Sequence, residues 1–169
     1  MKRIVILTLA ALLSVGLASA QNYMVIDSEK VFKSIKAYNE ALNSIDTLSE
    51  QYQKQVDAKF REVESMYNSY MQQRASLSEG TRQQYEQRIL QKEAEATKYQ
   101  ESIFGSEGEL MKRRVELIQP IQERVFSTIE SFAKQYGYDL VIDIAANPTV
   151  LYYSERVNCT EQIIRALQN

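Results

Sequence analysis

Few side chains in this sequence are of the types that perform acid–base or nucleophilic chemistry. The 169 residues include no His and a single Cys, Cys159. Without imidazole there is no His-based metal site and no Ser-His or Cys-His nucleophilic pair, and a lone Cys excludes an internal disulfide framework. Asp27 and Asp143 each follow an apolar run, but isolated carboxylates at strand ends more often cap turns. We therefore predict a protein that is not an enzyme, with no catalytic residue, metal site or cofactor.

Binding chemistry is more evident, because Tyr and Met residues are spread through a highly charged region. Residues 50–115 carry eleven acidic and eleven basic side chains, which gives solubility without a strong field of one sign. Tyr and Met offer large, adaptable contact areas, so this surface suits weak binding of many unfolded segments. The simpler role for any single one of these side chains is to pack the two helices of a hairpin together. The candidate contact residues are Met66, Tyr67, Tyr70, Met71 and Tyr85.

Two other features allow a functional and a plainer interpretation. Lys112-Arg113-Arg114 is a compact basic run that suits weak contact with lipopolysaccharide or an anionic membrane surface, although such runs are usually solvated helix faces. Cys159 falls in the first turn of a predicted helix, where a thiol can become reactive, but a packed side chain is the simpler role. The net charge of −2 does not indicate nucleic acid as a partner.

The first twenty residues have the pattern of a cleaved signal peptide. Lys2-Arg3 precedes an apolar run over residues 4–13, and Ala18-Ser19-Ala20 has the small-x-small form of a cleavage site. This apolar run is too short for a membrane anchor, which needs about 20 residues. Cleavage removes two basic residues and no acidic one, which leaves a net charge of −4. We predict an exported protein.

The mature chain is dominated by two long helical patterns. Residues 21–79 and 81–104 contain neither Gly nor Pro, and their apolar positions follow mostly three-four steps. A turn at Ser78–Thr81 would join two helices into an antiparallel hairpin. At ~1.5 Å per residue the outgoing helix spans roughly 60 Å, about twice the width of a compact globule of this size. We expect the hairpin to project as an arm.

Gly105 and Gly108 fall inside the predicted returning helix. Glycine in a helix interior costs ~1 kcal/mol relative to Ala, so the pair is either a tolerated weak spot or a hinge that lets the arm splay. On this placement, replacing both residues with Ala should stabilise the helix by up to ~1–2 kcal/mol.

The two ends of the mature chain predict a small β-rich body. Apolar runs at residues 23–27, 138–144 and 150–153 read as strands, and Asn158 can cap a final helix. Three short strands and a ten-residue helix cannot form a sizeable core alone, so we expect several protomers to pool them. The residues assigned to this shared core are Val25, Ile26, Leu140, Ile142, Ile144 and Leu151.

This layout resembles the Skp/OmpH family of periplasmic chaperones, most specifically at the two ends. The similar segments are Val25 to Phe32, Pro120-Ile121 through Tyr136 to Asp143, and Val157 to Ile164. The resemblance implies an α+β homotrimer whose helical arms enclose a cavity for unfolded outer-membrane proteins, without ATP. The sequence departs from the family in charge, because known members are basic and attract acidic clients, whereas this mature chain is acidic.

The predicted organisation is therefore a signal peptide over residues 1–20, a trimerisation body over 21–37 and 121–169, and a helical hairpin arm over 38–120. The predicted function is that of an ATP-independent holdase for outer-membrane β-barrel proteins. The alternative is a structural coiled-coil protein that spaces or tethers envelope components. A bare coiled coil would not need the C-terminal strands and capped helix, and would normally carry an anchor.

Overall fold

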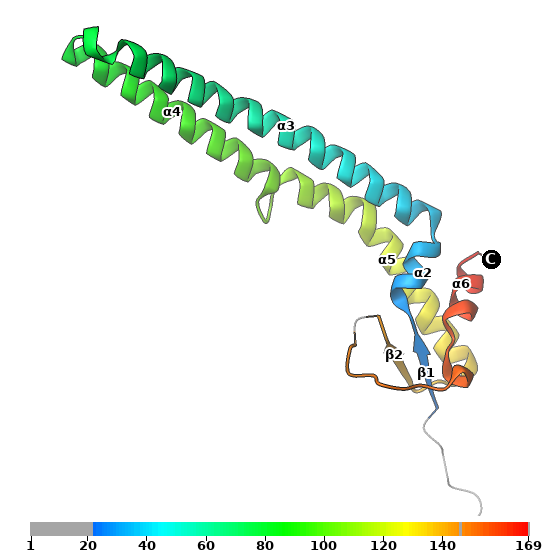
Figure 1. Ribbon diagram of the computed structural model, residues 1–169. Helices are drawn as coiled ribbons and strands as arrows, with labels where there is room; N and C mark the ends of the chain where they lie inside the picture. The colour runs from blue at the N-terminus through cyan, green and yellow to red at the C-terminus, as the bar shows by residue number, and fades with distance from the viewer. Residues whose placement is uncertain (1–21, 146, 169) are drawn as a thin grey trace, which may run out of the picture. The chain divides into compact units, whose positions relative to one another are not determined.

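The computed structural model describes residues 22–145 and 147–168, and the predicted signal peptide lies outside them. The chain divides into two compact units, one formed by residues 35–125 and the other by residues 22–34 and 126–168. It is mostly helical, with long helices and one small sheet (Figure 1). This much of the predicted fold is confirmed.

The first unit is an antiparallel helical hairpin. α3 (Lys36–Gln73) runs outward, a 3-10 turn (Arg74–Ser76) reverses the chain, and α4 (Glu79–Phe104) returns, followed by the first part of α5 (Glu109–Tyr136). Ser78 caps α4, because its side chain accepts a hydrogen bond from the Thr81 amide. The buried side chains of α3 and α4 are Ala41, Ile45, Val56, Tyr70, Ile89, Ala96 and Ile103.

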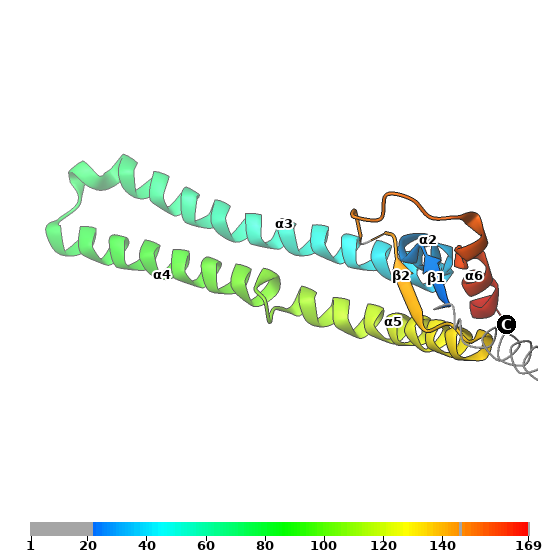
Figure 2. The same ribbon diagram turned by 90° about the horizontal axis from the view of Figure 1, so that it is seen from below.

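The returning helix is not continuous, which corrects the prediction of one long helix. Residues 105–108 form a loop between α4 and α5, and both views show it protruding from the helix path (Figures 1 and 2). A Cβ at Gly105 would lie 2.5 Å from the Glu101 carbonyl oxygen, and one at Gly108 would lie 2.4 Å from that of Ile103. Alanine therefore does not fit this loop, and the stabilisation expected from Gly→Ala is wrong for the conformation observed.

The second unit is a two-stranded parallel sheet packed with helices. β1 (Tyr23–Ile26) pairs with β2 (Leu140–Asp143), with Val25 opposite Ile142. Parallel strands require a crossover connection, and here the whole hairpin lies between the two strands in the sequence. α2 (Ser28–Ser34) and α6 (Thr160–Gln168) contact each other. The most buried side chains of this core are Met24, Val25, Val31 and Ile163.

The third predicted strand, at residues 150–153, does not form in the described chain. This segment has no regular secondary structure, and the side chains of Leu151 and Tyr152 are 93% and 85% exposed. The other edge of β1 is instead bridged by Val25 and Asn158. A strand needs a partner edge to satisfy its backbone groups, and the described chain gives this segment none.

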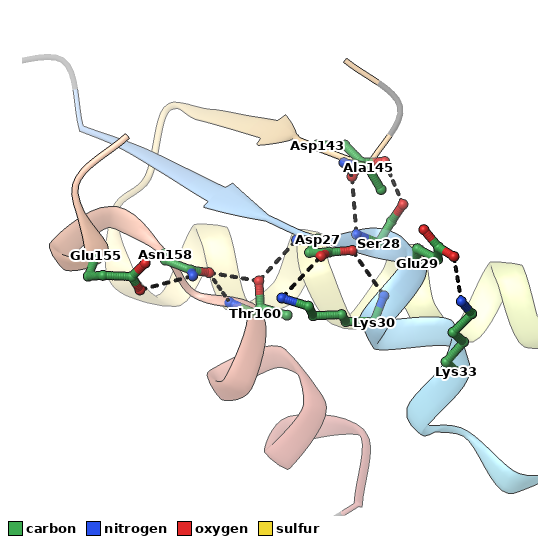
Figure 3. Close-up of polar contacts among 10 residues, drawn as sticks. All are labelled: Asp27, Ser28, Glu29, Lys30, Lys33, Asp143, Ala145, Glu155, Asn158 and Thr160. Atoms are coloured by element: carbon green, nitrogen blue, oxygen red, sulfur yellow. Dashed lines mark hydrogen bonds and ion pairs between the residues drawn. The ribbon is translucent and has the colours of Figure 1, made fainter. Parts of the chain in front are cut away.

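A polar network ties the ends of both strands to α2 and α6 (Figure 3). Ser28 donates from its amide and its hydroxyl to the Asp143 carboxylate, at 3.1 and 2.6 Å. The Asp27 carboxylate accepts from the Lys30 amide at 3.0 Å, while the Asp27 amide donates to the Thr160 hydroxyl oxygen at 2.9 Å. Both carboxylates thus act as caps, and the two strands and two helices are joined at one point.

Replacing Thr160 with Val should destabilise this unit by about 1–3 kcal/mol, because it removes the acceptor for the Asp27 amide at a buried position. Urea unfolding at fixed protein concentration measures the change. Thr97→Val, at an exposed position of α4, is the matched control and should stay within about 0.5 kcal/mol of the parent. Equal shifts for the two variants would contradict the assigned role of the Thr160 hydroxyl.

Candidate functional site

A groove lies near the tip of the hairpin, between the last turns of α3 and the first turns of α4. It is an open cavity of about 510 Å³. Large side chains of both antiparallel helices form its walls, and the 3-10 turn ends the hairpin just beyond it. The groove is lined by Tyr67, Tyr70 and Met71 of α3, by Arg74 at the start of the 3-10 turn, and by Glu86, Ile89, Leu90 and Glu93 of α4.

Tyr70 belongs to the packed core beneath this groove. Its side chain is 3% exposed and stacks on Tyr85, with ring centroids 5.9 Å apart. Its hydroxyl donates to a Glu86 carboxylate oxygen at 2.5 Å. This hydrogen bond, together with burial, raises the pKa of Tyr70, so the phenol stays protonated and continues to hold the two helices together. Tyr70 fixes the geometry of the groove and offers little free surface.

The accessible apolar surface of the groove comes from Tyr67, Met71 and Leu90, which are 51%, 46% and 64% exposed. Two of these three were predicted from the sequence, and Leu90 was missed. The sequence held a signal for Leu90, because Leu90, like Met71, lies beside the apolar stripe of its helix and not on it. Of the other predicted contact residues, Tyr85 stacks on Tyr70, and Met66 is half-buried and does not line the groove.

Below the groove, polar contacts hold α3 against α4. Lys92 lies between Glu62 and Glu95, at 3.5 and 3.4 Å, and the pKa of Lys92 is raised, mainly by its hydrogen bond to Glu95. The Tyr99 hydroxyl donates to the side-chain oxygen of Gln55. Because these groups are partly or fully exposed, their contacts contribute little to the stability of the hairpin. Their main effect is to fix how α3 and α4 are aligned.

The predicted basic run is exposed on α5. Arg113 pairs with Glu116 at 2.6 Å, a contact within one helix face. Arg114 borders a separate cavity beside the 105–108 loop. Contact of this run with an anionic surface stays a prediction.

In the second unit, the residues assigned to a shared core divide into two groups. Val25 and Ile26 are buried within the chain, and Ile142 and Ile144 are half-buried. Leu140 and Leu151 are exposed, and the other large exposed apolar side chains of this unit are Tyr23, Phe126, Tyr136 and Tyr152.

Cys159 is 3% exposed, and its sulfur lies 3.6 Å from the Tyr138 hydroxyl oxygen. This contact raises the pKa of Tyr138. Over residues 22–145 and 147–168, no group of three or more Cys, Asp or Glu residues is placed to hold a metal ion. None of the described helices combines the length and hydropathy needed to cross a membrane.

Comparisons with known proteins match nearly the whole described chain. A family model described as outer membrane protein (OmpH-like) matches residues 22–167. An uncharacterized protein of Aquifex aeolicus is 24% identical over 152 residues, which cover 90% of this chain and 89% of that protein.

Proposed function

The chain belongs to the OmpH-like family, and from this premise we propose that it is an ATP-independent holdase that keeps outer-membrane β-barrel proteins unfolded and soluble in the periplasm. The family is one of periplasmic chaperones rather than enzymes. The family therefore suggests binding of outer-membrane proteins, and the holdase activity of this chain is our proposal.

The observation that carries the proposal is the groove at the hairpin tip. Tyr67, Met71 and Leu90 are exposed together there, on an arm whose exposed side chains are otherwise mostly polar or charged. Strands of outer-membrane barrels alternate apolar and polar residues. Such a segment can place its apolar side chains on this surface and leave its polar ones in water. An open groove favours weak, reversible contact over tight binding.

We further propose that three copies assemble through the second unit. Within the described chain β2 pairs with β1 alone, so its outer edge is available to another strand. The segment at residues 150–153 is apolar and belongs to no sheet of the described chain, with Leu151 and Tyr152 almost fully exposed. Pairing between copies would provide hydrogen-bond partners for the backbone of this segment and would bury these side chains. Exposed sheet edges tend to pair with another strand in this way.

The experiment is aggregation of a β-barrel protein diluted from urea, followed by light scattering with and without this protein. Met71→Glu combined with Leu90→Glu should require roughly tenfold more protein for the same protection, because an apolar side chain of this size contributes ~1.5–3 kcal/mol when buried against a client. Both side chains are substantially exposed in the free chain, so folding should change little.

Gln72→Glu combined with Gln87→Glu is the matched control. Both positions are exposed on the same two helices and neither lines the groove, so the added charge is the same. Equal loss in both double variants would mean that charge, and not the groove, governs binding. A parent protein that gives no protection at all would favour the alternative role of a structural coiled coil.

A further inference from the structure

The loop at residues 105–108 closes on itself, so the helix resumes almost where it stopped. Gly105 donates its amide to the Glu101 carbonyl at 2.8 Å, and Gly108 donates to the Gly105 carbonyl at 2.9 Å. The Gly108 backbone then passes directly beside the Ile103 carbonyl. Figures 1 and 2 show α5 continuing alongside α3 beyond the loop. Four residues are thus excluded from the path of the returning helix.

The pairing of the helices changes at this loop. On the tip side, residue n of α3 faces a residue near 155 − n of α4, as shown by Tyr70 with Tyr85, Glu62 with Lys92 and Gln55 with Tyr99. An uninterrupted helix would continue this rule and place Ile118 opposite residue 37. Ile118 instead packs in a buried cluster with Ala41 and Ile45. α5 therefore lies about one helical turn closer to the tip, which matches the four residues held in the loop.

The sequence also fits the uninterrupted register. Ile89, Ala96, Ile103, Leu110 and Leu117 recur at intervals of seven, so a helix through residues 105–108 would keep all five on one stripe. Packing at the break is incomplete, because a cavity of about 310 Å³ is lined there by Ile45, Phe104, Leu110 and Met111 among others. The helical alternative is opposed mainly by the low helix propensity of two glycines.

We propose that residues 105–108 are a register switch between a looped state, in which α5 takes the observed position, and a helical state, in which α5 slides along α3 by about 6 Å away from the tip. The contacts between α3 and α4 are the same in both states. The returning arm thereby changes length by one turn without opening the hairpin at its tip. This inference rests on the geometry of the hairpin alone and does not depend on the proposed holdase activity.

Cysteine pairs in the full chain distinguish the two registers. In a Cys159→Ser background, Ala41→Cys with Ile118→Cys reports the looped state, and Ala37→Cys with Ile118→Cys reports the helical state. Gln55→Cys with Tyr99→Cys, on the tip side, should be unaffected. Mild oxidation followed by peptide mapping gives the yield of each disulfide. With the natural loop, the pair at 41 and 118 should dominate.

Gly105→Ala combined with Gly108→Ala should invert the ratio of these yields by roughly tenfold or more, because the two Cβ atoms do not fit the loop and both residues gain helix propensity. Deleting residues 105–108 should leave only the pair at 41 and 118, with full helix content by circular dichroism. The proposal is overturned if the alanine variant keeps the pair at 41 and 118, or if it loses both pairs together with helix content.

Discussion

Shortening the helical arm by two heptads on each side is expected to abolish protection of an unfolded β-barrel client and to leave the proposed trimer intact. The deletion removes residues 60–73 and 82–95 and keeps the natural turn at 74–81. Because a residue n of α3 faces a residue near 155 − n of α4, residue 59 then lies opposite residue 96 and the register is preserved. Of the residues that line the groove, only Arg74 remains. Protection should fall to the level of buffer in the light-scattering experiment.

A full-length variant separates the contact surface from the length of the arm. Tyr67→Gln, Met71→Gln and Leu90→Gln together remove the exposed apolar surface and keep both helices. If enclosure by long arms matters as well, this variant should retain part of the protection that the shortened arm loses. A shortened protein that still protects fully would place client binding outside the arm. One that no longer assembles would show that the arm is part of the interface.

Replacing Leu151 and Tyr152 with Asp is expected to convert the proposed trimer into monomers, with about a threefold fall in mass by sedimentation. Both side chains are almost fully exposed in the single chain, so their charge costs an isolated protomer little. In an interface the same change would bury two unpaired carboxylates, which is strongly unfavourable. The effect should therefore appear in the association state and not in the fold of the protomer.

Leu151→Ile combined with Tyr152→Phe is the control, since it keeps the apolar and extended character of the segment and should leave the mass unchanged. Circular dichroism of the Asp variant should match that of the parent. A variant with both Asp substitutions that sediments like the parent would rule out residues 150–153 as the contact between copies. This test is sharper than removal of residues 138–169, because that deletion also removes β2 and α6 from the core of each protomer.

The hairpin could be predicted because its cause is local and periodic. The apolar stripe and the absence of Gly and Pro over long stretches specify two antiparallel helices. The break at Gly105 could not be predicted in the same way, since Ile103, Leu110 and Leu117 continue the seven-residue spacing across it. What distinguishes the loop is the close approach of two glycine backbones to the carbonyls of Glu101 and Ile103, which is a property of the folded chain.

Strands and contact residues were harder to predict because they depend on distant partners. Residues 150–153 have strong β-propensity, yet a strand exists only when another edge receives it. Tyr70 is of a residue type that suits client contact, but it is buried, stacked on Tyr85 and hydrogen-bonded to Glu86. Leu90 is exposed because the stripe on α4 passes through Ile89 and not through its neighbour. Asp27 and Asp143 were anticipated as caps, although their joint role with Thr160 requires the closed sheet.

The parallel pairing of β1 with β2 sets the order in which the chain can mature. Tyr23 and Leu140 are register partners, so the first strand must wait for almost the entire chain before its backbone is satisfied. Contacts this distant in sequence are slow to form, whereas the hairpin contacts begin a few residues from the tip turn. In a chain that emerges N-terminus first, the hairpin would form before the sheet. The folded hairpin then brings the two strand segments close together, which lowers the entropic cost of pairing them. Until the two strands pair, the apolar side chains of Met24, Val25 and Ile26 remain exposed to water. A protein of this design would therefore itself pass through an aggregation-prone intermediate whose lifetime depends on how quickly its last thirty residues arrive.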